Sequence, residues 1–338
     1  MTKKVRQSNV ELLRIIAMVL VLIVHADFKA LSVPTIEDVL TMPISSFLRF
    51  LTESFSIICV NVFVLISGWF GIKFNWKKLT EFIFQVLFFG FTIYIIINII
   101  NPEKVNSIQT LFMAGPKNYW FVKSYLFLYI MSPCLNAFVE KASKNELKAL
   151  LILFFSMQTA YGWATDGATW FNKGYSGISF VGLYLFARYI RLYPIKWFNH
   201  SLKFDLFVYL CYIILNTILA FTFTANGHAT ICKKLFLYTS PFVIVASAHF
   251  LLAFTKFSFT SKTINWIAVS CFAIYLTHCN PFISSYYYQT IRNWFQNETT
   301  LDFITYTALF LFLIFWISIL ADKIRIFVFD KLFSKYLK

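Results

Sequence analysis

Continuous apolar runs of about twenty residues dominate the chain, and short polar segments separate them. A run of this length is what an α-helix needs to cross the hydrocarbon core of a membrane, about 30 Å thick. Strands of a membrane barrel alternate apolar and polar residues, and these runs do not. The pattern predicts an all-α, polytopic transmembrane helical bundle of about ten spans, at residues 9–27, 47–71, 79–100, 119–137, 148–164, 175–193, 204–224, 234–254, 264–283 and 301–321.

Composition supports a membrane location. Hydrophobic residues make up 59% of the 338 residues and charged residues only 13%, and the mean hydropathy is +0.68. A soluble domain of this length does not need so much apolar surface. The segments between the predicted spans are too short to fold alone, so we expect one transmembrane domain over residues 1–338 with no fused soluble domain.

The excess of 30 Lys and Arg over 15 Asp and Glu has two interpretations, a nucleic-acid partner or positively charged cytoplasmic loops. Basic residues cluster on alternate connecting segments, such as Lys73 and Lys77 after the second predicted span, and Arg188 and Arg191 at the end of the sixth. This alternation favours the second interpretation and predicts that both termini are cytoplasmic. We therefore expect a lipid environment and no nucleic acid, and the sequence leaves the oligomeric state unknown.

The first apolar run carries Arg14 and His25, two side chains that lipid disfavours. The two residues are eleven positions apart. In an α-helix this spacing leaves their side chains about 20° apart in azimuth and roughly 16 Å apart along the axis. A charged side chain in the bilayer costs about 2.5–3.5 kcal/mol on insertion scales, so Arg14 requires a function or a buried partner.

Two interpretations of this pair stay open. In one, Glu11 and Arg14 form an ion pair at i,i+3 spacing, and His25 is a structural histidine at the membrane surface. In the other, Arg14 holds an anionic ligand that enters from the cytoplasm, and His25 near the outer surface accepts a proton from a hydroxyl. His278, at the outer end of span 264–283 and at about the depth of His25, favours the second interpretation.

The remaining histidines and the cysteines give no comparable signal. The six cysteines are scattered, and neither Cys-x-x-Cys nor a Cys/His ligand spacing occurs, so we expect no metal site and no disulfide framework. His200, His228 and His249 have no partner at a matching depth, and we interpret them as structural.

Other polar residues are candidate substrate ligands. Glu53 lies in the second predicted span, where a carboxylate is costly, and Lys123 in the fourth span is its candidate partner. Asn61 either lines a polar seam or serves close helix packing. Aromatic and acidic side chains in the outer segment 161–174 are either interfacial anchors or a platform for a sugar ring: Trp163, Asp166 and Trp170.

In these motifs the chain resembles the acyltransferase-3 family of integral membrane acyltransferases. The stretch from Val10 to His25 looks like the family's Leu-Asp-x-Leu-Arg-Gly-x-Ala…His opening, with the Arg-to-His spacing intact. Residues 60–69 are similar to its Val-Asp-Leu-Phe-Phe-Val-Leu-Ser-Gly-Phe motif, and residues 119–125 and 270–278 match its later, looser signatures. Three positions depart from the pattern: Glu11 replaces Asp, Ile15 replaces Gly, and Asn61 replaces an Asp and so removes a carboxylate.

The resemblance implies acyl transfer in a bacterial plasma membrane. Bacterial members of the family O-acylate cell-surface glycans, so the donor is expected to be cytoplasmic acetyl-CoA or another acyl-CoA, with no permanently bound cofactor. The acceptor is expected to be an extracytoplasmic glycan or a lipid-linked precursor. His25, Arg14 and His278 are the expected catalytic residues, with the CoA phosphates near Arg14 and the basic cluster Lys73, Lys77, Arg188 and Arg191.

A different class remains open: a glycan or lipid transporter, in which Arg14, Glu53 and Lys123 line a substrate path. A third possibility is a structural partner within a polysaccharide synthase complex, which would tolerate replacement of His25.

Overall fold

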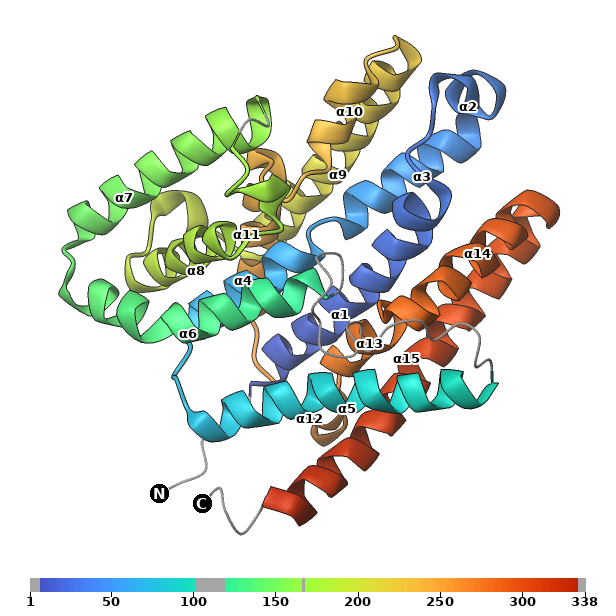
Figure 1. The fold of residues 1–338 in the computed structure, drawn as a ribbon. Coiled ribbons are helices and arrows are strands. Elements are labelled where there is room, and N and C mark those ends of the chain that lie inside the picture. Colours follow the sequence, from blue (N-terminus) through green and yellow to red (C-terminus); the bar gives the residue numbers. More distant parts are fainter. Residues whose placement is uncertain (1–6, 101–118, 166–167, 334–338) are drawn as a thin grey trace.

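The computed structural model describes residues 7–100, 119–165 and 168–333, and every regular element among them is helical. The predicted all-helical class is confirmed for these residues (Figure 1). The longer elements are α1 (Ser8–Val24), α3 (Pro43–Ser56), α4 (Cys59–Phe70), α5 (Trp76–Ile100), α6 (Trp120–Lys141), α7 (Lys144–Met157), α8 (Gly177–Leu192), α9 (Leu202–Ala225), α11 (Pro241–Thr255), α14 (Pro281–Asn297) and α15 (Thr300–Phe333). The shorter ones are α2 (Ile36–Thr41), α10 (Ala229–Leu235), α12 (Lys262–Ala268), α13 (Phe272–His278), the π-helices η1 (His25–Lys29) and η4 (Gln158–Ala164), and the 3₁₀ turns η5 (Asn172–Gly174) and η6 (Lys196–Phe198).

Six helical segments within the described residues are long and apolar enough to cross a membrane: Ser8–Lys29, Pro43–Phe70, Trp76–Ile100, Trp120–Lys141, Leu202–Ala225 and Thr300–Phe333. A seventh is obtained if α12–α13 and α14, bent by 82° at their junction, are counted as one span. Helices α7, α8 and α11 have 14, 16 and 15 residues. The molecule therefore has the helices of a multi-pass membrane protein, and the count of ten spans stays a prediction.

The predicted span 264–283 differs most from the structure, because it is not one continuous helix. The chain turns after His278, and Pro281 begins α14. Proline lacks the backbone N–H that continues a helix, and it is favoured in a first helical turn. The side chain of Asn280 caps the new helix by accepting from the Phe282 N–H at 3.0 Å. A break therefore lies directly beside His278.

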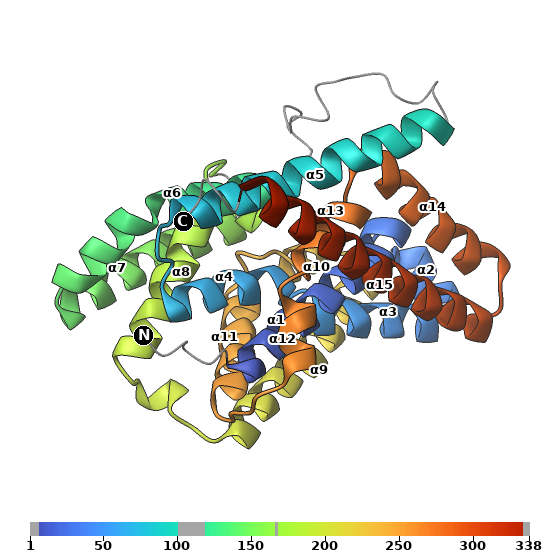
Figure 2. The same ribbon diagram turned by 90° about the horizontal axis from the view of Figure 1, so that it is seen from below.

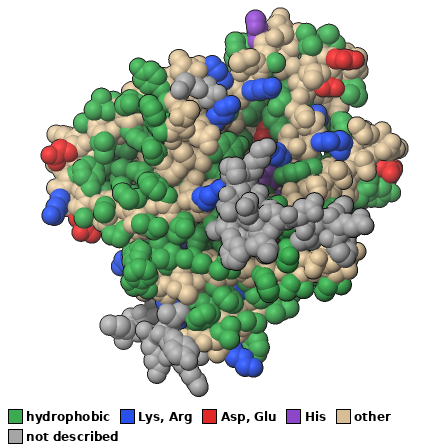
Figure 3. Space-filling view, viewed as in Figure 1, with side chains coloured by type: hydrophobic (Ala, Val, Ile, Leu, Met, Phe, Trp, Pro, Cys, Tyr) green, Lys and Arg blue, Asp and Glu red, His purple; other side chains and the backbone are tan. Residues whose placement is uncertain are grey.

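Helix α1 lies at the centre of the bundle, in contact with α3, α4, α11, α12 and α13 (Figures 1 and 2). Its Leu13, Ala17 and Leu20 side chains are fully buried. Helices α5 and α15 instead cross at the periphery and expose large apolar side chains, among them Phe91, Ile99, Phe312 and Phe327. Hydrophobic side chains cover much of the face shown in Figure 3. An apolar exterior of this extent is expected where a protein faces lipid.

The basic residues predicted to be cytoplasmic gather at one end of the bundle. Gly71 ends α4 with a φ of 74°, and the guanidinium of Arg188 is the group nearest to it. Asn136 of α6 donates to the Ile72 carbonyl at 2.7 Å, which ties the end of α6 to the same place. We call this the basic end of the bundle: Lys73, Lys77, Lys144, Arg188 and Arg191.

Orientation in the membrane is testable by cysteine labelling. With the basic end in the cytoplasm, a membrane-impermeant thiol reagent added outside is expected to label cysteines placed at 168–172 or 293–299. Cysteines placed at 73–78 or 141–148 should be protected until the membrane is permeabilised. The native cysteines are replaced first, so that Cys134 and Cys211, which are exposed, add no background. The reverse labelling pattern would contradict a cytoplasmic basic end.

Candidate active site

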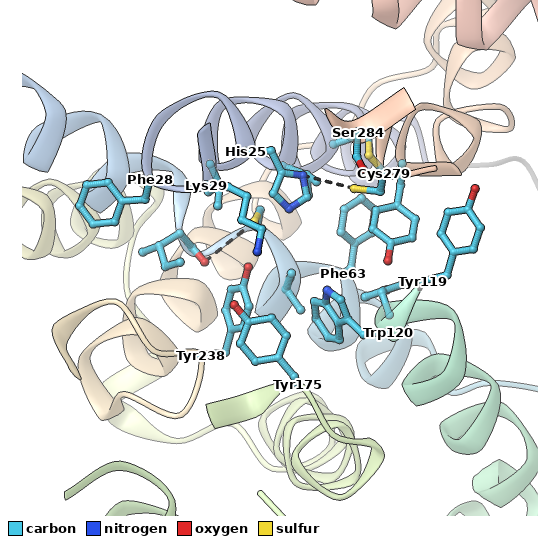
Figure 4. Close-up of a pocket in the computed structure, with 18 of the residues that line it drawn as sticks. His25, Phe28, Lys29, Phe63, Tyr119, Trp120, Tyr175, Tyr238, Cys279 and Ser284 are labelled. Atoms are coloured by element: carbon cyan, nitrogen blue, oxygen red, sulfur yellow. Dashed lines mark hydrogen bonds between the residues drawn. The ribbon is translucent and has the colours of Figure 1, made fainter. Parts of the chain in front are cut away.

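A cavity of about 530 Å³ lies beside the end of α1, near the start of α4, whereas the basic end adjoins the other end of α4. Its volume falls within the range of about 300–1,000 Å³ that is usual for small-molecule sites. The start of α4 contributes Cys59 and Phe63, whereas Phe70 at the other end of this 12-residue helix adjoins the basic end. At a rise of 1.5 Å per residue, Cys59 lies about 16 Å and Phe63 about 10 Å from Phe70 along the axis of α4. Figure 4 shows the cavity and the side chains around it.

His25 is the first residue of the π-helix that follows α1. Short π-helical turns are rare and occur often at functional sites, because they shift side chains out of the α-helical register. The hydroxyl of Tyr287 donates to the carbonyl of Leu22 at 2.8 Å and fixes α14 against this turn. Arg292 of α14 donates twice to the carbonyl of Ala30, at 2.8 and 3.1 Å. The backbone around His25 is thus held on both sides of the π-helix.

The two histidines expected at one depth are in direct contact. Nδ1 of His25 lies 2.8 Å from Nε2 of His278, although the residues are 253 positions apart in the chain. Nδ1 of His278 lies 2.6 Å from the carbonyl oxygen of Ile274, which can only accept a hydrogen bond. That nitrogen must therefore carry the hydrogen, and Nε2 of a neutral His278 is an acceptor.

The same argument fixes the tautomer of His25. Since Nε2 of His278 accepts, Nδ1 of His25 must donate to it, and Nε2 of His25 then has a free lone pair. Figure 4 shows the His25 ring directed toward the cavity, between Lys29 and Cys279. A neutral imidazole held in one tautomer by a second group, with its other nitrogen facing a cavity, is the arrangement of a general base.

The break after α13 positions His278. Asn280 donates from Nδ2 to the hydroxyl of Tyr119 at 2.8 Å, and that hydroxyl donates to the Leu276 carbonyl at 2.7 Å. Tyr119 directly precedes α6, so the break is tied to a second helix. His278 and Asn280 are both buried, and the position of His278 is therefore set by hydrogen bonds rather than by solvent.

Cys279 also touches the histidine pair. Its Sγ lies 3.4 Å from Nδ1 of His25 and 3.3 Å from Nε2 of His278. The thiol lines the cavity together with His25. Three atoms of the kinds that bind protons or metals therefore meet at one corner of the cavity.

Acidic and basic side chains lie at another part of the cavity wall. Glu53 is 2% exposed, lines the cavity, and has one carboxylate oxygen without a hydrogen-bond partner. Arg49, one turn earlier, donates from Nε to Asp27 at 2.8 Å and also bonds the Ser32 carbonyl. Among the described residues, no ion pair joins Glu53 to Lys123, the partner that the sequence suggested. The cation on the cavity wall is instead Lys29, which Figure 4 shows reaching over the cavity.

Aromatic rings form the wall facing His25. Trp120 stacks on Tyr238 with ring centroids 6.1 Å apart and meets Tyr175 edge-on at 4.4 Å. All three rings line the cavity. Flat apolar faces next to hydroxyl groups suit a sugar ring, which presents both C–H faces and hydroxyls.

Arg14 forms the expected ion pair, since its Nη1 lies 3.1 Å from both carboxylate oxygens of Glu11. Its side chain remains 38% exposed, so the guanidinium is not fully used by this pair. Arg191 at the basic end donates to the Trp69 carbonyl at 2.6 Å and lies over the rings of Trp69 and Phe70. The Nε of Arg188 is buried without a partner, and Lys73 and Lys77 are exposed.

Of the other predicted substrate ligands, Asn61, Trp163 and Trp170 do not line the cavity. Asn61 donates to the Tyr238 carbonyl at 3.1 Å, which fixes the loop that carries a cavity aromatic. Trp163 donates to the Lys234 carbonyl at 2.8 Å, and Trp170 is exposed. Asp166 lies outside the described residues. A role for these residues in binding an acceptor stays a prediction.

Sequence reasoning did not assign functions to Lys29, Tyr175, Tyr238 or Cys279. Lys29 was visible as a further charged residue on the first segment, one turn after His25. Cys279 follows His278 directly, but a single Cys-His neighbour pair is not specific. The tyrosines resemble interfacial anchors, and only the fold turns them inward.

Comparison with known proteins assigns the chain to a family. The acyltransferase-3 family model, described as an acyltransferase domain, matches residues 7–323, nearly the whole chain. No curated protein and no solved structure matches the chain. The match includes the segments that carry His25 and His278, which approach each other only in the folded bundle. The chain belongs to the acyltransferase-3 family of membrane acyltransferases.

Proposed function

We propose that the protein transfers an acyl group, expected to be acetyl, from cytoplasmic acyl-CoA to a hydroxyl of an extracytoplasmic glycan or of its lipid-linked precursor. The bacterial plasma membrane is the expected location. The observation that carries this proposal is Nε2 of His25, an acceptor nitrogen directed into a cavity and held by His278. A base there suits the activation of a hydroxyl for attack on a thioester.

The proposed reaction needs one proton acceptor. Nε2 of His25 takes the proton of the acceptor hydroxyl as its oxygen attacks the thioester carbonyl carbon. The imidazolium that results still donates from Nδ1 to His278, whose Nε2 accepts. When the carbon–sulfur bond breaks, the CoA thiolate leaves and is protonated by His25. The products are an O-ester and the CoA thiol, and His25 returns to its neutral form.

Lys29 is a candidate for stabilising the charge that develops during attack. The thioester oxygen becomes negative in the tetrahedral intermediate, and a positive group already in place lowers the energy of that state. Lys29 lies on the same π-helix as His25 and lines the same cavity. The aromatic rings opposite would hold the sugar, and the free carboxylate oxygen of Glu53 would accept from one of its hydroxyls.

The donor would approach from the basic end. CoA carries phosphates and cannot cross a bilayer, whereas its acyl-pantetheine arm is thin and long. The phosphates would be held by Arg188, Arg191, Lys73 and Lys77, since guanidinium and ammonium groups are the usual phosphate ligands. Arg14, on the same helix as His25, would contact the arm or a phosphate between the basic end and the cavity.

Substitution of Arg14 tests this path. Arg14→Ala is expected to weaken binding of acyl-CoA, and Arg14→Lys to restore it only in part, because lysine lacks the planar guanidinium fork. The measurement is acyl-CoA affinity of purified protein by calorimetry. Lys262→Ala, at the start of α12, is the matched control for loss of one basic charge outside the proposed path. If both Arg14 variants fold and bind acyl-CoA like the parent, Arg14 does not contact the donor.

Release of CoA thiol separates an enzyme from a transporter. Protein in membranes that contain the native glycan precursors is supplied with acetyl-CoA, and free thiol is measured with a chromogenic disulfide. An acyltransferase is expected to release thiol in proportion to the ester formed on the glycan. Absence of thiol release, together with movement of labelled glycan or lipid across the membrane, would contradict the proposal and support a transporter.

A further inference from the structure

His25, His278 and Cys279 bring together three atoms that can bind a metal ion, a property that the proposed transfer reaction does not use. Its three closest atoms are two imidazole nitrogens and one sulfur, mutually separated by 2.8, 3.3 and 3.4 Å. Thiolate and imidazole are the ligand types of zinc and similar divalent metals. His25 is 253 positions from His278 along the chain, so no sequence spacing could suggest the site.

We propose that His25, His278 and Cys279 form a zinc-type metal site, and that metal bound there inhibits acyl transfer. In tetrahedral zinc with bonds of about 2.0 and 2.3 Å, ligand nitrogens are about 3.3 Å apart and nitrogen and sulfur about 3.5 Å apart. The observed separations are shorter by about half an ångström for the nitrogens and about 0.2 Å for sulfur. Small side-chain rotations would therefore open the cluster to coordination distances.

The surroundings have the features of a metal site. Nδ1 of His278 lies 2.6 Å from the Ile274 carbonyl, and a ligating histidine usually donates its other N–H to such a group. That bond leaves Nε2 of His278 aimed at the cluster. His25 and Cys279 both line the cavity, which gives the metal an entry path and leaves its fourth position open to water.

Inhibition follows from the tautomer of His25, and this part of the inference rests on the proposed function. Coordination by Nδ1 requires its lone pair, so the hydrogen of the neutral ring moves to Nε2. Nε2 then has no lone pair for the acceptor hydroxyl and cannot serve as the base. The thiol of Cys279 loses one proton to solvent when it binds as thiolate. Metal binding and catalysis thus compete for one imidazole.

The test measures binding and inhibition separately on the whole protein. Zinc chloride and cobalt chloride are titrated into purified parent, Cys279→Ser and Cys211→Ser, the last removing an exposed cysteine as a control. Calorimetry is expected to show one zinc ion per parent chain, and cobalt a sulfur-to-metal absorption band that Cys279→Ser lacks. Loss of an outer-shell partner alone costs about 10–100-fold in metal affinity, so loss of this ligand is expected to weaken zinc binding at least about tenfold.

Activity gives the second readout. The activity of each protein is compared with its own activity in the absence of metal. The zinc concentration that halves this activity is expected to be at least about tenfold higher for Cys279→Ser than for the parent. For Cys211→Ser it should equal that of the parent. A chelator should restore the parent. Equal zinc affinity in parent and Cys279→Ser would overturn the site, and activation by zinc would overturn the competition. Because binding is measured directly, failure of the proposed acyl transfer leaves the site itself testable.

Discussion

Replacing His25 with alanine is expected to lower acyl transfer at least about a hundredfold, because general-base assistance contributes about 10²–10⁴ in rate. Nε2 of His25 is the acceptor that faces the cavity, and its partner His278 is engaged with Ile274 on its far side. His278 is fully buried and does not line the cavity, so its Nε2, although left without a partner, does not reach the acceptor hydroxyl without rearrangement. The measurement is initial rate of ester formation from acetyl-CoA in membranes, normalised to the amount of folded protein.

The control for this variant is His228→Ala, which removes an exposed histidine before α10 and is expected to behave like the parent. Expression, monodispersity and acyl-CoA affinity of His25→Ala should survive, since the phosphates are proposed to bind at the basic end. Loss of folding together with activity would indicate a structural histidine. Transfer near the parent's level would remove His25 from the mechanism and favour a structural partner of a synthase complex.

Substitution of His278 is expected to give the second largest effect. In a Ser-His-Asp enzyme, removing the group that fixes the tautomer of the catalytic histidine costs about 10⁴-fold in turnover. A neutral imidazole stabilises the imidazolium less than a carboxylate does, so we expect a loss of at least about tenfold for His278→Ala. His278→Gln should recover part of it, because the amide oxygen can accept from Nδ1 of His25.

The pair of His278 variants distinguishes positioning from packing. Acyl-CoA affinity should be the same in both, since His278 is expected to act through His25 and not on the donor. The rate of transfer should follow the order parent, Gln, Ala. If the Gln variant is no better than Ala, hydrogen-bond acceptance by His278 does not account for its effect. If Ala matches the parent, the tautomer of His25 is set by another group.

Arg14 and His25 could be identified as candidate site residues from the sequence alone. Both lie on one apolar segment, where a charged or titratable side chain is costly and therefore conspicuous. His278 was found by depth, because it ends a predicted span at about the level of His25. The Glu11–Arg14 ion pair follows from i,i+3 spacing and is present at 3.1 Å.

Features that depend on long-range packing were not predictable from the sequence. The contact between His25 and His278 joins η1 to α13, and the tautomer of His25 depends on the Ile274 carbonyl. The proposed Glu53–Lys123 pair failed because helical pattern does not reveal which helices are neighbours, and Glu53 faces the cavity. The bend of 82° beside His278 was missed as well, because the apolar sequence continues across it although the helix ends there.

The most direct test of the account is a structure of the protein with a thioether analogue of acetyl-CoA, which binds like the donor but cannot transfer its acyl group. The acyl end is expected in the cavity. A hydroxyl oxygen placed in hydrogen-bond contact with Nε2 of His25 should then lie within about 3–3.5 Å of the carbon that it would attack. The phosphates are expected at the basic end, near Arg188 and Arg191. An analogue bound with its acyl end outside the cavity, or with phosphates at the histidine side, would contradict the account.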